Sequence, residues 1–331
     1  MHQRPLGPFS VSAIGLGCMN ISMGYGKADE AESIRLLQTC IDEGYTFLDT
    51  AAMYGWGYSE QMIGTHLKHR RDDYVLASKC GFVKDDTGNS VFDGSPQAIR
   101  TTCEQSLRNL QTDVIDLYYL HRIDPKVPVE DSVGALADLV HDGKIKTIGL
   151  SEVSTESLRR AHAVFPIAAL QSEYSLWSRT PERKILSACE ELDVAFVPFS
   201  PLARSFLTGI TPEPEDLHEN DIRATIARPR FEGENYKKNK QLLPAYKTIA
   251  DEVGCSMAQL ALAWVLARHG RRMIPIPGTK DIQHMRENAA AGDIVLDDEI
   301  VSRLDALINE STVVGTRYTE AGMKAADSER D

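Results

Sequence analysis

Residues 49–55 read Asp-Thr-Ala-Ala-Met-Tyr-Gly and follow the short apolar run Tyr-Thr-Phe-Leu at residues 45–48. Gly44, a type of residue that often ends a helix, precedes the run, so the pattern predicts a short buried strand. The strand would carry Asp49 to its carboxyl end, with Tyr54 in the turn that follows. A carboxylate at the end of a buried strand does little for stability, which indicates a functional role.

Two later apolar runs also end in ionisable residues. Residues 75–78 (Val-Leu-Ala-Ser) lead into Lys79, and residues 115–120 (Ile-Asp-Leu-Tyr-Tyr-Leu) lead into His121. The carboxyl ends of parallel strands in a barrel meet at one face, where active sites of such barrels lie. We therefore expect Asp49, Tyr54, Lys79 and His121 at one rim.

The rest of the chain alternates short apolar runs with helical patterns, giving eight strand-then-helix units. Continuous apolar runs are typical of parallel strands buried on both faces. No Gly-x-Gly-x-x-Gly loop opens a helix, which weakens the alternative of an open dinucleotide-binding sheet. The sequence predicts one α/β domain over residues 1–331, a (β/α)8 TIM barrel with extra C-terminal helices. A long irregular loop over residues 200–236 follows strand 7, and residues 311–331 form a polar tail.

The element boundaries follow from apolar spacing, caps and breakers. We expect strands at residues 11–16, 45–48, 75–78, 115–120, 145–150, 168–171, 195–199 and 273–276, with a possible hairpin in the polar stretch before the first. We expect helices at residues 29–44, 59–67, 95–110, 129–142, 155–164, 181–192, 241–253, 256–268, 281–290 and 297–309.

Composition excludes several classes of function. The net charge of −12 over 331 residues argues against a nucleic-acid surface. No apolar run approaches the roughly 18 residues of a membrane span, and no signal segment is evident, so we expect a cytoplasmic protein. The six cysteines form no Cys-x-x-Cys pair and are expected to be core residues. His66 and His69 share a helix face without a third ligand, and we predict no metal site.

The order Asp49, Tyr54, Lys79, His121 resembles the catalytic tetrad of the aldo-keto reductases. The resemblance runs from Ile14-Gly15-Leu16-Gly17 to Ile276-Pro277-Gly278-Thr279, nearly the whole chain. It implies NADPH-dependent reduction of small aldehydes or ketones to alcohols. Tyr54 would be the general acid, with its pKa lowered by Lys79. Asp49 would hold Lys79, and His121 would orient the carbonyl.

The resemblance also implies a set of cofactor contacts near the nicotinamide. Ser151 and Gln171 would hold the carboxamide, and Phe199 would stack on the ring. The backbone of the following loop, which includes Ser200, Leu202 and Arg204, would line the pyrophosphate. Residue 152, commonly Asn in the family, is Glu152 here, and its role is left open.

A second group of implied contacts concerns the adenosine half of NADPH and the rim. Thr279 and Lys280 precede a helix, and helix N-termini attract phosphate, so this corner is expected at the 2′-phosphate. His284 stands where many relatives have an arginine. The further expected contacts are Glu287 and Asn288 on the adenine, Arg223 over the pyrophosphate, and Cys18 and Met19 on the nicotinamide side.

Two alternatives concern the kind of protein within this resemblance. The tail motif Gly315-Thr316-Arg317-Tyr318 resembles a branch that includes pyridoxal reductases. The rival function is a cofactor-binding regulatory subunit, like the potassium-channel β subunits, which share the fold and the tetrad and would consume little NADPH. The sequence predicts neither the physiological substrate nor the oligomeric state.

Overall fold

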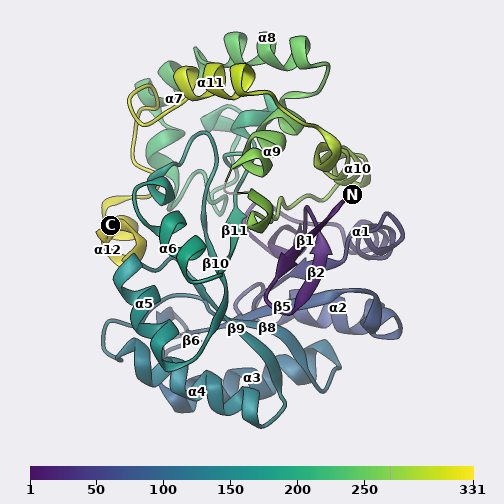
Figure 1. Ribbon diagram of the computed structural model, residues 1–331, viewed down its shortest axis with the longest axis vertical. Helices are drawn as coiled ribbons and strands as arrows, with labels where there is room; N and C mark the ends of the chain where they lie inside the picture. Colours follow the sequence, from purple (N-terminus) through teal and green to yellow (C-terminus); the bar gives the residue numbers. More distant parts are fainter. Residues whose placement is uncertain (269) are drawn as a thin grey trace.

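The computed structural model describes residues 1–268 and 270–331. Its central sheet contains seven parallel strands in the order β11-β10-β9-β8-β5-β4-β3 (Figure 1). Their bounds are β3 Leu16–Gly17, β4 Phe47–Asp49, β5 Val75–Cys80, β8 Ile115–Leu120, β9 Ile145–Ser151, β10 Ile167–Glu173 and β11 Ala195–Phe199. Neighbouring strands follow one another in the chain, as in a barrel built from repeated strand-then-helix units.

Residues 273–277 take the eighth place and join the two edge strands. The N–H groups of Ile274 and Ile276 donate to carbonyls of β11 at 2.9 and 3.0 Å. On the other side, the carbonyls of Pro275 and Pro277 accept from Gly15 and from Gly17 of β3 at 3.0 and 3.3 Å. Proline has no N–H, so a regular ladder is not possible on both sides. The predicted (β/α)8 barrel is confirmed, with an irregular eighth strand.

The N-terminus forms an antiparallel hairpin of β1 (Gln3–Leu6) and β2 (Phe9–Ser12). Its apolar residues join the cluster inside the barrel, and a Cβ at Gly7 would meet Ala168 near the start of β10 at 2.9 Å. The hairpin therefore covers the amino-terminal end of the barrel. The expected first strand at residues 11–16 is wrong in its bounds, because its first two residues pair in the hairpin and only Leu16–Gly17 joins the barrel.

A second hairpin, β6 (Phe82–Lys84) with β7 (Ser90–Phe92), follows β5 and was not predicted. It lies just after Lys79, so it belongs to the loops at the carboxyl face. The sequence signal for it was an Asp-Asp-Thr-Gly-Asn turn between two short apolar runs.

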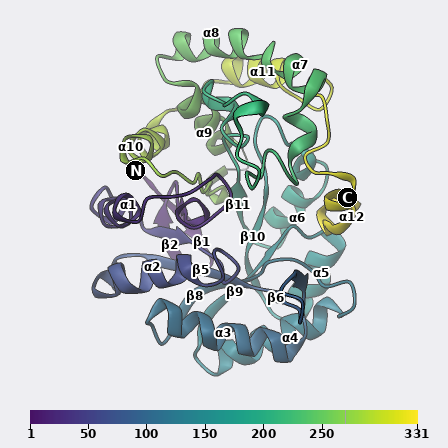
Figure 2. The ribbon, with the colours of Figure 1, turned by 180° about the vertical axis from the view of Figure 1, so that it is seen from behind.

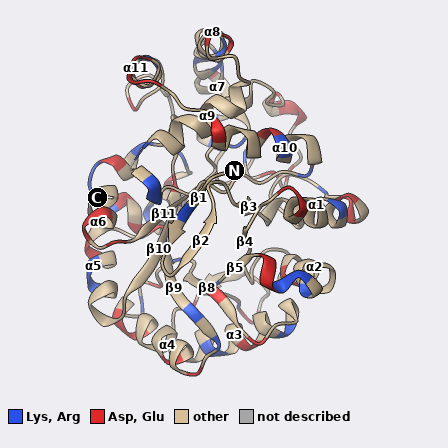
Figure 3. Cartoon of the chain, turned by 45° about the vertical axis from the view of Figure 1, so that its right-hand side comes forward, with Lys and Arg blue, Asp and Glu red and all other residues tan. Residues whose placement is uncertain are grey.

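Twelve helices of the described residues cover the barrel or extend from it. Their bounds are α1 Glu30–Asp42, α2 Tyr58–Leu67, α3 Pro96–Leu110, α4 Val129–His141, α5 Thr155–Val164, α6 Ile185–Glu191, α7 Gly233–Lys240, α8 Leu243–Val253, α9 Met257–Ala267, α10 Ile282–Ala290, α11 Asp298–Leu307 and α12 Glu320–Ala325. Figure 3 shows them around the outside of the strands, where most of the Lys, Arg, Asp and Glu residues also lie.

Local chemistry explains where several helices begin. Asp29 caps α1 through the N–H of Glu32, and Ser95 caps α3 ahead of Pro96 at its first position. Ser256 and Gln259 form a capping box at α9. Two bounds differ from expectation: α6 begins only at Ile185, because residues 180–182 form a separate short 3-10 helix, and α7 lies partly inside the loop that was expected to be irregular.

The core divides into two layers that alternate along each strand. One layer fills the barrel interior, and the other lies between the strands and the helices. In β8, Leu117 and Tyr119 face inward, whereas Tyr118 and Leu120 face the helices. Because side chains alternate along a strand, the residue two places beyond the last inward apolar residue also faces inward, at the carboxyl rim. This rule positions the site described below.

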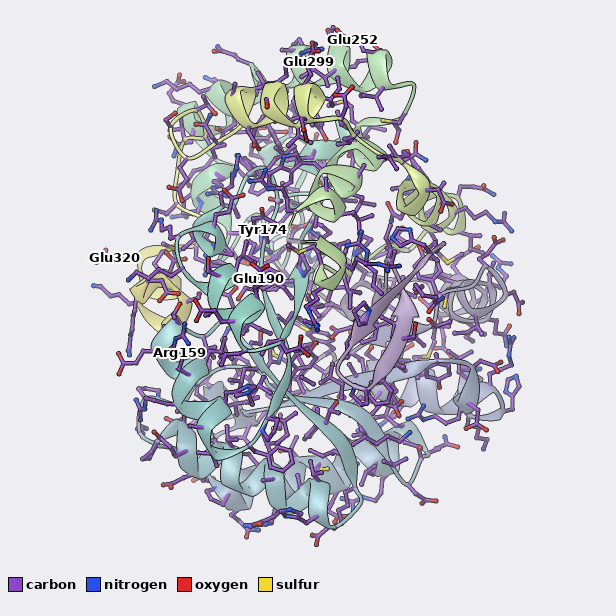
Figure 4. All side chains as sticks on the ribbon, in the orientation of Figure 1. Arg159, Tyr174, Glu190, Glu252, Glu299 and Glu320 are labelled. Carbon is purple, nitrogen blue, oxygen red and sulfur yellow. The ribbon has the colours of Figure 1, made fainter. Side chains whose placement is uncertain are left out.

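The C-terminal helices extend beyond the barrel. The Arg303–Glu252 ion pair joins α11 to α8, and Glu252 and Glu299 lie at the same end of the molecule (Figure 4). Helix α12 lies beside α5 and α6 in both Figure 1 and Figure 2. The tail is anchored there by Asp327, which accepts from the Ser154 N–H at 2.8 Å. The expected polar tail is therefore not simply solvated, and it contains α12.

Candidate active site

The predicted tetrad lies at the carboxyl rim and is mostly buried. Lys79 Nζ lies 2.5 Å from Asp49 Oδ1, 2.7 Å from the Thr50 carbonyl and 3.5 Å from Tyr54 Oη. The side chains of Lys79 and Asp49 are 0% and 2% exposed. The alternation rule explains the arrangement, because Lys79 lies two residues beyond inward-facing Ala77 and Asp49 two beyond inward-facing Phe47.

Tyr54 is positioned by a tight turn rather than by a strand. Its N–H donates to the Ala51 carbonyl at 3.0 Å, and the next three residues, Gly55, Trp56 and Gly57, all have positive φ. The two glycines adopt this conformation at little cost, whereas Trp56, with φ of 53°, is strained. The turn returns the chain over the rim and directs it into α2.

His121 follows β8, two residues beyond inward-facing Tyr119. Its ring contacts that of Tyr54 edge-on at 5.8 Å and that of Phe82 from the second hairpin at 5.1 Å. Burial, followed by the positive charges of Lys79 and Arg122, lowers the pKa of His121 well below its ordinary value. His121 is therefore a neutral imidazole at neutral pH, able to donate one hydrogen bond.

The pKa of Tyr54 shifts in the direction opposite to the one expected from the sequence. Burial raises the pKa of the Tyr54 phenol, and the charge of Lys79 offsets only part of that effect. Burial also opposes the charge of Lys79, but Asp49 and Tyr54 outweigh it and raise the pKa of Lys79. Burial likewise raises the pKa of Asp49, against the opposing effects of Lys79 and Gln171. The result is a neutral phenol beside the Lys79–Asp49 ion pair. The sequence-based expectation of a lowered Tyr54 pKa included the charge of Lys79 but not the removal of the phenol from water.

Gln171 and Ser151 lie next to the tetrad, on β10 and β9. Gln171 Nε2 donates to the second oxygen of Asp49 at 2.8 Å, so Asp49 is held from both sides. Ser151 Oγ accepts from Arg122 Nη1 at 3.0 Å. Arg122 was missed by the sequence reasoning, although its position directly after His121 at a strand end was a usable signal.

Glu152 is bound to the C-terminal tail. Its carboxylate accepts from both terminal nitrogens of Arg317, from Ser328 Oγ at 2.7 Å and from the N–H of Glu173 at 2.8 Å. These contacts outweigh burial and lower the pKa of Glu152 to about 2. Glu152 also has a φ of 55°, which is strained for this residue type. The position left open by the sequence is therefore occupied by one half of a buried ion pair.

The tail motif has a structural explanation in the same network. Arg317 is 6% exposed and also bonds Glu329. The centroid of the Tyr318 ring lies 4.7 Å from the guanidinium of Arg317 and 5.4 Å from that of Arg204. The adjacent Gly315 has a φ of 95°, and a Cβ there would lie 2.6 Å from the Pro229 carbonyl. The motif thus connects the tail to the loop after β11.

The loop after β11 has an unusual backbone. Ser200, Ala203, Arg204 and Ser205 all have positive φ, a conformation that costs energy for residues other than glycine. The Arg204 side chain is buried and donates to Glu173 Oε2 at 2.7 Å, so the backbone rather than the guanidinium is available to a ligand. The neighbouring positions Phe199 and Leu202 are partly buried at the rim.

Arg223 connects this loop to a second one. Its guanidinium donates to Ser205 Oγ at 2.7 Å, pairs with Asp221 at 2.7 Å and lies 5.2 Å from the centroid of the Tyr25 ring. The N–H of Ile222 donates to the Gly24 carbonyl at 2.9 Å. Two segments far apart in the sequence, around residues 24 and 222, therefore lie side by side next to the loop after β11.

Residues 279–284, which are expected to lie at the 2′-phosphate, already form hydrogen bonds with other parts of the chain. Lys280 Nζ donates to three carbonyls of residues 25–27 at 2.7, 3.0 and 3.1 Å, and the neighbouring Thr279 is buried. Asp281 caps α10 by accepting from the N–H groups of Gln283 and His284. The helix N-terminus is therefore satisfied by a carboxylate rather than open. The His284 side chain is exposed.

The remaining residues that are expected to contact the cofactor differ in how exposed they are. Asn288 is buried on α10, and Glu287 beside it is partly exposed. Met19 is partly exposed in a short 3-10 helix after β3. Cys18 is fully buried in the layer between strands and helices, so its thiol is turned away from the barrel interior and only its backbone lies at the rim.

Other features of the molecule lie outside this rim. A cavity of about 330 Å³ lies at the opposite end, near the N-terminal hairpin, and is lined by residues such as Gly7, Lys146 and His162. Residues at that end of a barrel serve stability rather than catalysis. Within residues 1–268 and 270–331, no group of three or more His, Cys, Asp or Glu side chains is arranged to hold a metal. Five of the six cysteines are buried, and all six are free.

In the described part of the chain, no single helix combines the length and the apolar composition of a membrane span. One pair, residues 233–253 and 257–267, passes this criterion only when taken together, and it is bent by 79°.

Comparison with known proteins places the chain among relatives. Residues 13–309 match the model of the aldo/keto reductase family. The chain is 39% identical to aldo-keto reductase yakc [NADP(+)] of Schizosaccharomyces pombe, over 95% of this chain and 94% of that one. It is similar to the structure of glycerol dehydrogenase AKR11B4 from Gluconobacter oxydans (TM-score 0.83, 29% identity, covering 92% and 93%). It is also similar to an aldo-keto reductase from Klebsiella pneumoniae in complex with NADPH (TM-score 0.74, 29% identity, 96% and 98%). The chain therefore belongs to the aldo/keto reductase family.

Proposed function

We propose that this protein is an NADPH-dependent oxidoreductase that reduces small aldehydes and ketones to alcohols. The observation that carries the proposal is the buried rim cluster, in which Lys79 Nζ lies between Asp49 and Tyr54 with His121 edge-on to Tyr54. Membership of the family and the NADP of the yakc name support it. So does the NADPH bound to the Klebsiella relative.

The residues at the rim fit a nicotinamide cofactor. Strained non-glycine backbone persists where the surrounding structure enforces it, and it clusters at ligand-binding sites. The loop of Ser200–Ser205 contains such strained non-glycine residues and lies next to Phe199. Ser151 and Gln171 would hold the carboxamide, Phe199 would stack on the ring, and the loop backbone with Arg223 would hold the pyrophosphate. When bound, NADPH supplies a hydride to the carbonyl carbon.

Tyr54 would donate the proton that the carbonyl oxygen requires. Its raised pKa keeps the phenol protonated at neutral pH, so the donor is always present. As the proton leaves, negative charge develops on Oη, and the Lys79 ammonium at 3.5 Å stabilises it. Asp49 and Gln171 keep Lys79 in place, and neutral His121 donates a hydrogen bond to the carbonyl oxygen. Burial of the cluster excludes water, which strengthens each of these interactions.

Lys280 and His284 are proposed to select NADPH over NADH. Lys280 already lies on the backbone of residues 25–27 with its ammonium facing three carbonyls. A 2′-phosphate would provide a charged acceptor in place of neutral ones, and charge-assisted hydrogen bonds are about twice as strong as neutral ones. Thr279 and Glu287-Asn288 would complete the adenosine side.

Tyr54→Phe tests the proton donor, because it removes only the hydroxyl. We expect it to lose most of the kcat for aldehyde reduction while binding NADPH about as tightly as the parent. Loss of one general acid costs roughly 10²–10⁴-fold. Lys79→Met should be severely impaired as well, because the developing phenolate would lack its cation. NADPH consumption is followed by absorbance, and binding by quenching of tryptophan fluorescence.

The matched control is Tyr58→Phe, which changes an exposed tyrosine on α2 whose hydroxyl lies 3.3 Å from Glu30. It should leave kcat unchanged. Aldehyde reduction by Tyr54→Phe at near-parental rate would contradict the assignment of the acid.

A further inference from the structure

Arg122 is a partly buried cation at the rim with two neutral acceptors. Its Nη1 donates to the His121 carbonyl at 2.6 Å and to Ser151 Oγ at 3.0 Å. These contacts place the guanidinium between the ends of β8 and β9, beside the proposed proton donor and hydrogen-bond donor. Among the described residues, no Asp or Glu forms an ion pair with Arg122.

The acids around Arg122 have partners of their own. Asp49 pairs with Lys79, Glu152 with Arg317 and Glu173 with Arg204. Asp124, two residues after Arg122, accepts instead from the backbone N–H groups of Gly94 and Lys126 at 3.2 and 2.9 Å. Each of these acids thus has a partner other than Arg122, which acts on Glu152 only through its charge at longer range.

The guanidinium retains unused hydrogen-bonding capacity. It has five N–H donors in a planar fork, and the contacts within the described structure involve only Nη1. The other edge, formed by Nε and Nη2, matches a carboxylate, which accepts two parallel hydrogen bonds. The charge of Arg122 also acts on His121 and Tyr54, since it contributes to the lowered pKa of the one and offsets the raised pKa of the other.

The second hairpin adds aromatic groups beside His121 and a cation beside the turn that follows Tyr54. Phe82 contacts the His121 ring at 5.1 Å, and Phe92 lies 5.0 Å from Phe82. At the tip, Lys84 Nζ lies 4.8 Å from the centroid of the Trp56 ring, and Trp56 is 42% exposed. The surroundings of the tetrad therefore combine aromatic faces with positive charge.

We propose that Arg122 determines substrate specificity by binding a carboxylate group of the substrate. The substrate class is then small aldehydes and ketones that carry a carboxylate near the carbonyl, with an aromatic or aliphatic body against the rings of the hairpin. The inference rests on the proposed carbonyl reduction and adds no chemical step to it.

A pair of substrates that differ in charge and by one methyl group tests the inference. We compare 3-formylbenzoate with its methyl ester for the parent, Arg122→Met and Arg122→Lys. Arg122→Met should lower kcat/KM for 3-formylbenzoate by about 10- to 100-fold, mainly through KM, because a charge-assisted contact is lost. The ester should change by less than about 3-fold, since its uncharged group makes no charge-assisted contact. Arg122→Lys should recover part of the loss. The control Arg100→Met, on the exposed face of α3, should change neither.

A direct binding measurement separates this inference from the proposed function. Benzoate should raise the melting temperature of the NADP⁺-saturated parent but not that of Arg122→Met. Absence of aldehyde turnover by the parent would contradict the reductase function, whereas the benzoate effect would still support the anion site.

Three outcomes would overturn the inference. The first is an equal loss of kcat/KM for the acid and the ester, with NADPH affinity retained. The second is an equal loss accompanied by weaker NADPH binding, which would make Arg122 a cofactor residue. The third is equal stabilisation of the parent and Arg122→Met by benzoate.

Discussion

Lys79 is a fully buried cation whose charge is retained because three oxygens surround it. Asp49 and the Thr50 carbonyl lie within 2.7 Å, and Tyr54 Oη lies at 3.5 Å. An unpaired charge at this depth would neutralise by shifting its pKa. The ion pair therefore maintains a positive potential beside a phenol that burial keeps protonated. Neither His121 nor Tyr54 changes its charge near neutral pH.

These ionisation states predict a flat pH profile. The pKa of Tyr54 is raised, so the phenol loses its proton only above about 10, and the pKa of His121 lies well below about 6.5. We expect kcat/KM for a neutral aldehyde to be constant between about pH 7 and 9 when measured with NADPH. The lower limit lies above the second ionisation of a phosphate ester, at about 6. A decline with a midpoint inside that interval would contradict the assigned states.

At the residue scale, the sequence predicted the tetrad but not its electrostatics. Four ionisable residues at or just after successive strand ends can be recognised from the sequence alone. The sign of the Tyr54 shift depends on burial, which the spacing of residues does not contain. The partner of Glu152 was hidden for a different reason, because Arg317 lies far along the chain and meets it only when the tail folds back.

Strand alternation connects the core to the site at the scale of elements. The inward face of β8 continues from Leu117 through Tyr119 to His121, and β5 continues from Ala77 to Lys79. The Tyr119 ring lies beneath Lys79, with Nζ 5.7 Å from its centroid. It fits because β9 has Gly149 opposite, where a Cβ would lie 2.3 Å from the Tyr119 ring. The large Tyr119 ring therefore packs in the space that the missing side chain of Gly149 leaves.

Gly149→Ala should therefore displace the Tyr119 ring against the tetrad. We expect a loss of about 1–3 kcal/mol in the free energy of unfolding, as for other overpacked cores, together with a lower kcat. The change is measured by urea denaturation and by aldehyde reduction. Gly134→Ala is the matched control, because a Cβ there on helical α4 meets nothing within 4 Å. It should stabilise by about 0.5–1 kcal/mol. Parental stability and activity of Gly149→Ala would show that the ring can move freely.

The element boundaries were predictable where local chemistry sets them. Caps at Asp29, Ser95 and Ser256 gave helix starts close to those observed. The irregular form of the eighth strand was less predictable from the sequence, because its hydrogen bonds join residues far apart in the chain. The eighth strand needs Ile274 and Ile276 to meet β11 while Pro275 and Pro277 meet β3 and its neighbour Gly15.

For the molecule as a whole, the C-terminal tail is part of the frame around the site. Arg317 connects Glu152 after β9 with Glu329, and the Glu173 carboxylate lies 3.6 Å away. Glu173 in turn binds Arg204 in the strained loop. The tail, two strand ends and the loop after β11 therefore share one buried charge network. Removing one member leaves a buried charge without its partner, which typically costs about 3–5 kcal/mol.

This network predicts how stability depends on acid. The pKa of Glu152 is about 2 in the folded protein against an ordinary value of 4.5, so the unfolded chain binds the proton more readily. The stabilisation is therefore complete above about pH 4.5 and is lost as the pH falls toward about 2. Glu152→Gln should show a shallower fall of the unfolding free energy across this interval. Glu320→Gln, an exposed member of an i,i+4 pair with Lys324, should retain the parental slope. Identical slopes for the parent and Glu152→Gln would contradict the role of the pair.

The overall architecture followed from repetition along the chain, since eight alternating units favour a closed barrel. What distinguishes an enzyme from a cofactor-binding subunit of the same fold is how many times the cofactor reacts. The most direct measurement is therefore the number of NADPH molecules that one chain oxidises with a panel of aldehydes in excess NADPH. A reductase is predicted to complete many turnovers per chain, and Tyr54→Phe to lose them. Oxidation that stops at about one NADPH per chain with every aldehyde would contradict the account.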